Sequence, residues 1–249
     1  MQADNVLVPD WPAPKNVKAL MTTRLGGVST GGFNSLNLGA HVHDTLAHVM
    51  QNRHLLANHI GLTESRFAWL SQTHGQTITS AVAGGKVVAA DGSDTSEAKL
   101  ACVVMTADCL PVLLCDQTGT KVAAIHAGWR GLAGGILKKA VQRFPEPSRV
   151  MAWLGPAISQ AYFEVGRDVY QAFVTNNVLN QSAFIAGDAP NKWMADIYGL
   201  ARIQLKGVGV ARIYGGECCT FSDEKRFYSY RRDGALSGRM ASLIWLNDT

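Results

Sequence analysis

The sequence predicts an α/β protein in which helices pack on a mixed β-sheet, in the broad sense that includes α+β arrangements. Apolar residues recur every three to four positions in four segments, as is typical of amphipathic helices. Eight shorter apolar runs, rich in β-branched and aromatic residues, are expected to be strands. Since strands outnumber helices and some are joined by short turns, the sheet is expected to be mixed or antiparallel, in a layered sandwich.

The expected elements follow one another without a linker, repeat or low-complexity segment, so we expect one catalytic domain over residues 1–249. Asp44 and Gly61 are placed to cap the first helix, whose three histidines, His48, His54 and His59, are expected on a solvated face. The helices are expected at 45–59, 132–144, 167–176 and 193–206. The strands are expected at 18–23, 102–106, 110–115, 121–126, 150–154, 211–214, 227–230 and 241–246.

The composition indicates a folded protein with a large buried core. Hydrophobic residues make up 47% of the chain and charged residues 17%, which argues against disorder. The net charge of +4 permits a small anionic substrate. No run of Lys or Arg is typical of a nucleic-acid surface, so no nucleic-acid partner is expected.

The N-terminal segment and the cysteines predict a cytoplasmic protein. "MQADNVLVPDWPAPKNVKAL" has acidic residues and prolines where a signal peptide has a basic start and an apolar stretch. No segment approaches the roughly 18–20 apolar residues that span a bilayer, so no membrane partner is expected. Five cysteines do not form a disulfide framework, which favours free thiols in a reducing compartment. We expect a monomer or a weak homo-oligomer.

The stretch "TADCLPVLLCDQTGTKVAAIHAGWRG" concentrates candidate chemistry in one hairpin. If Asp116 faces Gly119 across the turn, Cys109 faces His126, with Cβ atoms about 4.5–5.5 Å apart. At that separation one metal ion can bridge both side chains, or the thiol can hydrogen-bond the imidazole. A three-residue bulged loop would shift the register by one residue and remove this pairing.

A catalytic zinc site needs a third protein ligand and leaves its fourth position to water. His74, in "WLSQTHGQTI", lies in an expected loop and is the first candidate, while His41 and His43 of "NLGAHVHDT" compete for the role. Spacing alone does not decide among the three. A zinc-stabilised binding protein would need a fourth ligand, which Cys115 cannot supply because it lies about 20 Å from Cys109 along an extended strand.

Seven blocks of this sequence resemble the YfiH-like family, also called the laccase-domain, polyphenol oxidoreductase or peptidoglycan editing factor family. The resemblance covers nearly the whole chain in the same order. It implies an α/β sandwich likened to cysteine hydrolases, and a zinc site formed by His74, Cys109 and His126. The blocks are "TTRLGGVSTGGFNSLNLGAHVHD", "SQTHG", "TADCLPVLLCD", "IHAGWRGLAGG", "WLGPAIS", "FEVG" and "FYSYRRDGALSGRMASLIWL".

The resemblance implies a zinc-dependent purine nucleoside phosphorylase, which converts adenosine, inosine or guanosine and phosphate to the free base and ribose 1-phosphate. Adenosine deaminase and methylthioadenosine phosphorylase activities accompany it in the family. One alternative is a metal-free cysteine hydrolase or amidase that edits peptidoglycan precursors, with Cys109 as nucleophile and His126 as base. Another is a copper-dependent polyphenol oxidase, because a His₂Cys ligand set also suits Cu²⁺.

Phosphorolysis needs side chains that hold a phosphate dianion, a task suited to the planar fork of arginine. The substrate and phosphate candidates are Arg24, Arg130, Arg231 and, in "NLG", Asn37. Deamination instead needs a carboxylate that moves protons, for which Asp108, Asp91 and Asp94 are candidates.

Two positions depart from the family pattern. His43 stands before Asp44, where the family has glycine, and it either brings a further imidazole near the site or points outward. Cys218 precedes Cys219, which is the matching cysteine.

Overall fold

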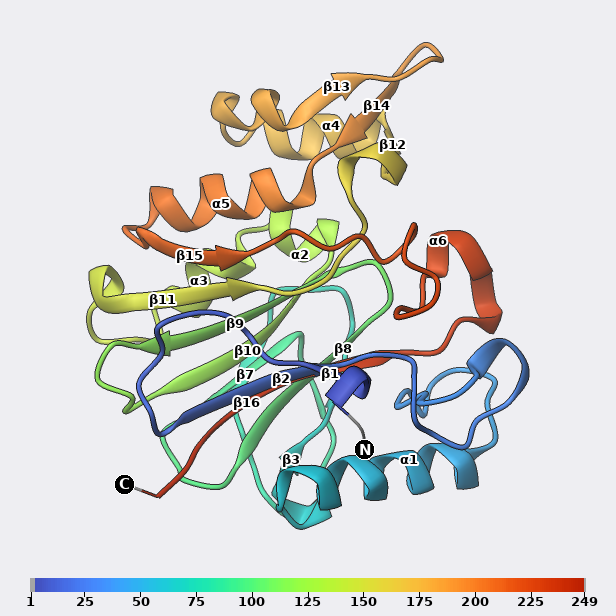
Figure 1. Ribbon diagram of the computed structural model, residues 1–249. Coiled ribbons are helices and arrows are strands. Elements are labelled where there is room, and N and C mark those ends of the chain that lie inside the picture. The colour runs from blue at the N-terminus through green and yellow to red at the C-terminus, as the bar shows by residue number, and fades with distance from the viewer. Residues whose placement is uncertain (1–2, 249) are drawn as a thin grey trace.

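Two β-sheets packed face to face form the centre of the computed structural model, which describes residues 3–248 (Figure 1). The six-stranded sheet has the order β15-β11-β9-β10-β7-β5, and the five-stranded sheet the order β1-β2-β16-β8-β3. Each sheet contains both parallel and antiparallel pairs. The first sheet is built from β5 (Ile78–Ser80), β7 (Gly92–Thr95), β9 (Leu110–Asp116), β10 (Val122–Ala127), β11 (Val150–Leu154) and β15 (Arg212–Gly215). The second is built from β1 (Val6–Leu7), β2 (Val17–Thr22), β3 (Phe67–Ala68), β8 (Ala101–Thr106) and β16 (Met240–Leu246).

Helices cover the outer faces of both sheets, which gives four layers (Figure 1). Three helices pack on the six-stranded sheet: α2 (Trp129–Ala133), α3 (Ile136–Val141) and α5 (Ile197–Gly207). The long helix α1 (Leu46–Ile60) packs on the five-stranded sheet. The short helix α6 (Tyr230–Asp233) lies beside the ends of the sheets.

A smaller three-stranded sheet stands above α5, with α4 (Arg167–Val174) against it (Figure 1). Its strands are β12 (Glu164–Gly166), β13 (Phe184–Ala186) and β14 (Lys192–Ala195). Val165, Val169 and Phe173 from this part belong to the same apolar cluster as β9 and β10, so its packing continues that of the main body. The parallel pair of β4 (Leu70–Ser71) and β6 (Val88–Ala89) completes the strands of the described residues.

Alternation along β9 shows how the layers are specified. Leu110, Val112 and Leu114 pack under the helices, whereas Leu113 and Cys115 pack between the two sheets. All seven residues of β9 are buried, because both faces of the strand are covered. An apolar run without polar alternation is therefore the expected pattern for a strand in the inner layers.

The mixed α/β architecture confirms the predicted fold class, but three expected elements need correction. The helix expected at 132–144 is two helices, because Gly134 and Gly135 interrupt it and Gly135 adopts a left-handed φ of 87°. The helix expected at 193–206 begins only at Ile197, because 192–195 pairs as β14 and Asp196 is the N-cap. The strand expected at 227–230 has no pairing partner and leads into α6, whose N-cap is Ser229.

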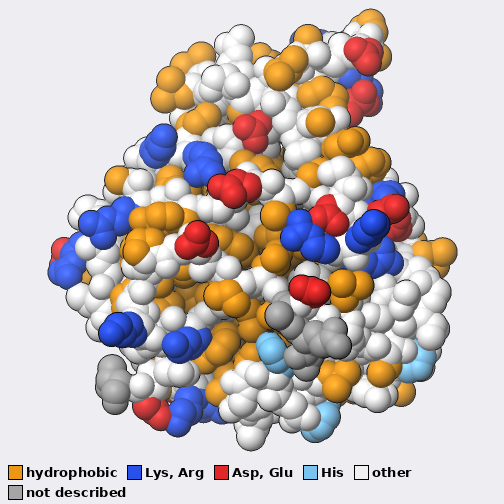
Figure 2. Space-filling model, viewed as in Figure 1, with side chains coloured by type: hydrophobic (Ala, Val, Ile, Leu, Met, Phe, Trp, Pro, Cys, Tyr) orange, Lys and Arg blue, Asp and Glu red, His pale blue; other side chains and the backbone are white. Residues whose placement is uncertain are grey.

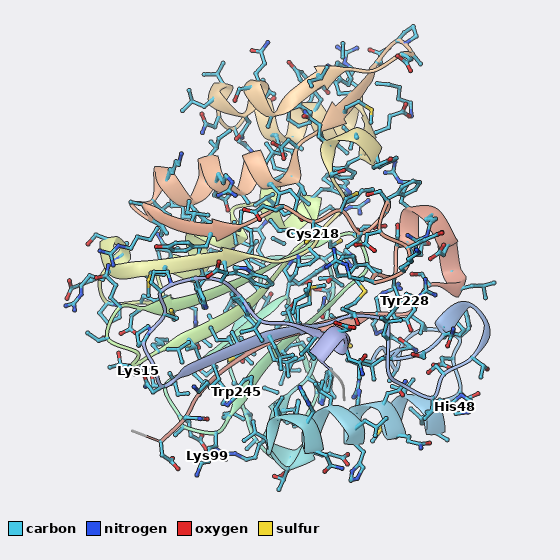
Figure 3. The ribbon with its side chains drawn as sticks, in the orientation of Figure 1. Lys15, His48, Lys99, Cys218, Tyr228 and Trp245 are labelled. Atoms are coloured by element: carbon cyan, nitrogen blue, oxygen red, sulfur yellow. The ribbon has the colours of Figure 1, made fainter. Side chains whose placement is uncertain are left out.

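The surface carries both signs of charge and the described helices are short. On the face in Figure 2, Lys and Arg side chains are interspersed with Asp and Glu, without a continuous basic patch. Within residues 3–248, no helix combines the length and apolar character needed to cross a bilayer. The five cysteines are free thiols, and Cys218, labelled in Figure 3, is half-buried.

Candidate metal centre and substrate pocket

The hairpin of β9 and β10 carries two of the candidate ligands, in a register that differs from the predicted one by two residues. Val122 pairs with Cys115 and Ala127 with Leu110, so His126 lies opposite Pro111. The predicted two-residue turn is wrong: Asp116 faces Lys121, and its carboxylate accepts hydrogen bonds from the backbone N–H groups of Thr120 and Lys121 at 2.8 and 3.0 Å.

A register shift of two residues does not change which face a side chain occupies, because the side-chain period of a strand is two. His126 remains on the same face as Val122 and Ala124, which pack between the two sheets. Cys109, one residue before β9, is its diagonal neighbour rather than its direct partner. Both side chains therefore meet at the end of the layer between the sheets.

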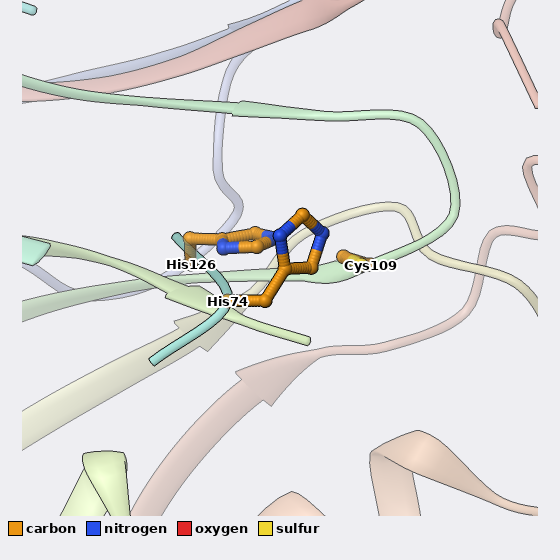
Figure 4. A group of neighbouring side chains, drawn as sticks. All are labelled: His74, Cys109 and His126. Carbon is orange, nitrogen blue, oxygen red and sulfur yellow. The ribbon is translucent and has the colours of Figure 1, made fainter. Parts of the chain in front are cut away.

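The structure brings His74, Cys109 and His126 together (Figure 4). One ligand atom of each lies within 4.8 Å of the other two, and the two imidazole rings stand nearly perpendicular, at 87°. His74 comes from the loop between β4 and β5, Cys109 from the bend before β9 and His126 from β10. His126 is buried, Cys109 half-buried and His74 exposed, so one side of the group is open.

The backbone is left-handed at two positions, and this conformation orients the side chains of His74 and Cys109. His74 has a φ of 59° and Asp108, directly before Cys109, a φ of 87°. Such values are uncommon for residues other than glycine and need support from the surrounding structure. Asp108 has that support, because its carboxylate accepts hydrogen bonds from Thr220 Oγ1 at 2.7 Å, Ser229 Oγ at 3.0 Å and the Arg231 N–H at 2.6 Å.

The buried carboxylate of Asp91 contacts the ring of His126 and the backbone of His74. Its Oδ1 lies 2.8 Å from His126 Nδ1 and accepts the His74 N–H at 2.9 Å. Its Oδ2 accepts the Gly75 N–H at 2.7 Å and the Thr73 hydroxyl at 2.9 Å. Because Nδ1 of His126 faces Asp91, the other ring nitrogen is left to face Cys109.

Two glycines of "HAGWRG" have different roles at the site: Gly128 leaves space at its centre, and Gly131 allows close packing beside it. A Cβ on Gly128 would lie 3.2 Å from Cys109 Sγ, 3.3 Å from His74 Cδ2 and 3.4 Å from His126 Cε1, so this glycine leaves free the space at the centre of the group. A Cβ on Gly131 would lie 2.5 Å from the carbonyl oxygen of Gly75. Gly131 therefore lets α2 pack against the loop that carries His74.

The surroundings of Cys109 and His126 favour a negative charge on the thiol and a positive charge on the imidazole. Burial alone would raise the pKa of the Cys109 thiol, but His126 and His74 lower that pKa to about 6. Burial alone would lower the pKa of His126, but Cys109 and Asp91 raise it to about 9. At neutral pH the metal-free pair is thus a thiolate beside an imidazolium, and a thiolate is the form of cysteine that binds metals.

A pocket of about 470 Å³ opens beside the three side chains. Its positive side chains are Arg231 and Arg239, and neither lies within 4 Å of a carboxylate oxygen in the part of the chain that the structure describes. Arg231 lies 5.7 Å from the Phe163 ring centroid and Arg239 5.7 Å from that of Tyr230. The lining consists of His41, Gln72, His74, Met105, Thr106, Ala107, Asp108, Cys109, His126, Ile158, Phe163, Tyr230, Arg231 and Arg239.

Three of the predicted substrate residues lie outside this lining. Arg24 donates to the carbonyl oxygens of Asn34 and Glu224, and Arg130 stacks on Trp129 in a separate surface groove. Asn37 is fully buried, and its Oδ1 accepts the Arg239 N–H at 2.9 Å. Asn37 therefore supports the segment that carries Arg239.

Three residues of the site were not predicted to bind substrate or to orient the candidate metal ligands. Arg239 lies within the block "FYSYRRDGALSGRMASLIWL" but was given no role there, and His41 was considered only as a third metal ligand. Asp91 was considered only as a proton carrier, because no strand was expected around "ADGSDT", where the structure has β7. His43 is exposed, and neither it nor Cys218 is part of the pocket lining.

The geometry of the three side chains fits a metal ion with an open coordination position. Bonds of about 2.3 Å to sulfur and 2.0–2.1 Å to nitrogen place ligand atoms about 3.3–3.6 Å apart around one tetrahedral ion. The three ligand atoms lie within 4.8 Å of one another, so small side-chain movements bring them to that spacing. Among residues 3–248, no fourth His, Cys, Asp or Glu joins the group. Fold and site together define an α/β protein with a His₂Cys group that could hold a metal ion at the mouth of a cationic pocket.

Comparison with known proteins agrees with this description. The family described as multi-copper polyphenol oxidoreductase laccase matches residues 18–247. "Purine nucleoside phosphorylase PA4543" of Pseudomonas aeruginosa is 51% identical over 97% of this chain and 98% of its own length. "Purine nucleoside phosphorylase YfiH" of Escherichia coli is 48% identical over 97% and 98%, respectively. The crystal structure of the Neisseria meningitidis protein NMB0706 superposes with a TM-score of 0.94, at 52% identity, over 98% of this chain and 100% of that one. The chain belongs to the YfiH-like family.

Proposed function

We propose that the protein is a zinc-dependent purine nucleoside phosphorylase. The observation that carries the proposal is the placement of Arg231 and Arg239 in the same pocket as the three candidate metal ligands. Neither arginine has a carboxylate partner among residues 3–248, and a pocket with two such guanidinium groups favours a dianion such as phosphate. The names of the relatives, given above, support the same reaction.

The pocket offers separate environments for the base and for the phosphate. Phe163, Tyr230 and Ile158 supply apolar and aromatic surface on which a purine ring can stack. Arg231 is anchored by the carbonyl oxygen of Glu164 at 3.1 Å, and Arg239 by those of Ser237 and Gly238 at 2.7 and 2.9 Å. These anchors hold both guanidinium groups in place before phosphate binds, which lowers the entropy cost of positioning them.

In phosphorolysis, an oxygen of phosphate forms a bond to C1′ while the bond from C1′ to the base breaks. The base leaves with the bonding electron pair and takes up a proton, and ribose 1-phosphate is the second product. The positive charge that develops on the sugar is stabilised by the phosphate dianion, which Arg231 and Arg239 hold beside it. His41 lines the pocket; burial and the nearby Arg239 lower its pKa, so at neutral pH it offers a neutral imidazole to the leaving base.

His74, Cys109 and His126 would hold the zinc ion, which supplies a Lewis acid at an open coordination position. Asp108 has a positioning role in this proposal rather than that of a proton carrier, because three protein groups already donate to its carboxylate. It joins the bend at Cys109 to the start of α6, which carries Arg231. The buried carboxylate of Asp108 thus sets the distance between the metal centre and Arg231, which would bind phosphate.

The test is a phosphate titration of inosine conversion, with ribose 1-phosphate as the measured product. The wild type should show saturation with phosphate, and Arg239→Gln should raise the KM for phosphate about tenfold or more, as expected for loss of a charged contact worth about 1.5–3 kcal/mol. Arg130→Gln is the matched control, because Arg130 lies in another groove, and its KM should not change. Release of base at the same rate without phosphate would contradict the proposal.

A cysteine-type amidase is the second candidate, and one observation favours it. Asp91, His126 and Cys109 form a continuous row of carboxylate, imidazole and thiolate, the arrangement of an oriented base beside a nucleophile. Such an enzyme would keep its activity in the presence of a chelator and would release an amine or amino acid from a peptide-like substrate. The phosphorylase would lose its activity in the chelator and would require a nucleoside.

Adenosine deamination and copper oxidase activity are weaker alternatives. A deaminase needs a carboxylate free to move protons, whereas Asp91, Asp94 and Asp108 already accept several hydrogen bonds each. Reduction of oxygen to water uses several coppers with many histidine ligands, but the described residues assemble a single three-ligand group. Formation of inosine from adenosine without phosphate, or oxidation of a phenol by the copper-loaded protein, would favour these alternatives.

A further inference from the structure

We propose that Asp91 is the positioning residue of the metal centre and that its single carboxylate orients both histidine ligands. The inference rests on the proposed metal site but not on phosphorolysis. Asp91 is not a metal ligand, because both of its oxygens are occupied by protein donors on the side of the histidines away from the pocket. The side chain is fully buried, so water does not reach the hydrogen bonds that its carboxylate makes.

The first effect of Asp91 is on His126. Its Oδ1 accepts the proton on Nδ1 across 2.8 Å. The proton that leaves the imidazolium when a metal binds is therefore the one on Nε2, whose lone pair then faces the metal. The His126 N–H also donates to the carbonyl oxygen of Asp91 at 2.7 Å, so ring and backbone are held by the same residue. A histidine restrained in this way presents a stronger and better oriented ligand than a free one.

The second effect is on His74, which lies on another segment of the chain. The N–H groups of His74 and Gly75 and the hydroxyl of Thr73 all converge on the Asp91 carboxylate, at 2.9, 2.7 and 2.9 Å. Three successive residues therefore bind one anion, and the middle one has the left-handed φ of 59°. The negative charge of Asp91 offsets the cost of that backbone conformation and holds His74 over the site.

Asparagine at position 91 would keep the size of the side chain but not its bonding. If its NH₂ group took the place of Oδ2, it would face the N–H of Gly75. If it took the place of Oδ1, it would face the N–H of His74, and His126 would have to move its proton to Nε2, the nitrogen that should bind the metal. Either orientation places donor against donor, so the substitution should disturb both ligands at once.

Asp94, which lies in β7 three residues after Asp91, supplies a matched control. It is also buried, but its carboxylate pairs with Lys121 at 3.0 Å and Arg143 at 2.6 Å, and it contacts none of the three candidate ligands. Asp94→Asn therefore reports what loss of a buried carboxylate does to the fold. Asp91→Asn reports that effect together with any effect on the ligands.

The experiment measures zinc affinity by competition with chelators, together with the absorption spectrum of the Co²⁺-substituted full-length protein and its melting temperature. Asp91→Asn should weaken zinc binding about 10–100-fold and change the thiolate-to-cobalt absorption. Asp94→Asn should lower the melting temperature but leave affinity and spectrum as in the wild type. Equal zinc affinity in Asp91→Asn and the wild type, or an equal loss in both variants, would overturn the inference.

If Asp91→Asn does not fold, a second variant tests whether the Asp91 carboxylate orients the histidines. Thr73→Val removes only the hydroxyl that donates to Oδ2 and keeps the buried charge. It should weaken zinc binding several-fold, and an unchanged affinity would overturn the inference. A wild-type protein that binds no zinc would overturn the metal site itself, whereas equal affinities would overturn only the role of Asp91.

Discussion

Some residues of the site could be predicted from sequence motifs, and others could not. The motifs "QTHG", "ADC" and "HAGWRG" mark His74, Cys109 and His126, and the structure brings these three together. Of the four predicted substrate residues, only Arg231 lines the pocket, because a position beside a glycine-rich turn does not say which way a side chain points. Arg239 could not be selected from the sequence, since its role depends on the end of β16 meeting the loop at Asn37.

The charges of Cys109 and His126 make metal binding dependent on pH. Between about pH 6 and pH 9 the metal-free pair is thiolate and imidazolium, so binding must expel one proton, from His126. Below about pH 6 the thiol must lose a proton as well, because its lowered pKa lies there. Apparent zinc affinity should therefore fall about tenfold per unit as the pH decreases from 9 to 6, and more steeply below pH 6.

Chelator competition at fixed ionic strength, from pH 5 to 9, measures this dependence. Proton release on metal addition gives an independent count, of about one proton per ion at pH 7.5. A flat affinity between pH 6 and pH 9 would show that no imidazolium has to be neutralised.

At the scale of elements, the hairpin and the helix that follows it place the ligands. The strands of the hairpin were predicted nearly to the residue, but its turn was not, because "DQTGT" has no favoured two-residue turn. The actual turn depends on the Asp116 carboxylate and on Gly119, which has a φ of 67°. The strands β12 to β14 were missed, because short segments of mixed polarity carry little periodic signal.

The contact between α2 and the loop of His74 gives a prediction at this scale. In Gly131→Ala, the new Cβ would meet the Gly75 carbonyl oxygen at 2.5 Å, so helix and loop must separate. We expect a loss of about 1–3 kcal/mol in the free energy of unfolding, as for other overpacked contacts, and weaker zinc binding because His74 moves. Denaturant unfolding and metal titration measure the two effects.

Gly207→Ala, near the end of α5, is the matched control. Nothing lies within 4 Å of its Cβ position and its φ is not left-handed, so alanine there should be neutral or stabilising by up to about 1 kcal/mol. If Gly131→Ala behaved like this control, the close approach of α2 to the loop would not be needed for the site.

The whole molecule explains why the site lies where it does. The two sheets enclose an apolar layer along most of their length, and at one end of this layer stand His126 and Cys109. Segments far apart in the sequence close that end: the loop at His74, the bend at Asp108, the segment at Arg239 and α6 with Arg231. The layered class was predictable from the helical periodicity, the short apolar runs and the short turns between them, whereas this convergence depends on tertiary packing that local patterns do not encode.

The central claim is that one ion is held by three side chains from three segments of the chain. The most direct measurement is the metal content of the purified, dialysed protein beside the variants His74→Ala, Cys109→Ala and His126→Ala, with Cys218→Ser as the control outside the pocket. We predict about one zinc ion per chain in the wild type and in the control, and loss of the ion together with loss of phosphate-dependent turnover in each of the three variants. A folded Cys109→Ala protein that keeps its metal and still converts inosine and phosphate would contradict the account.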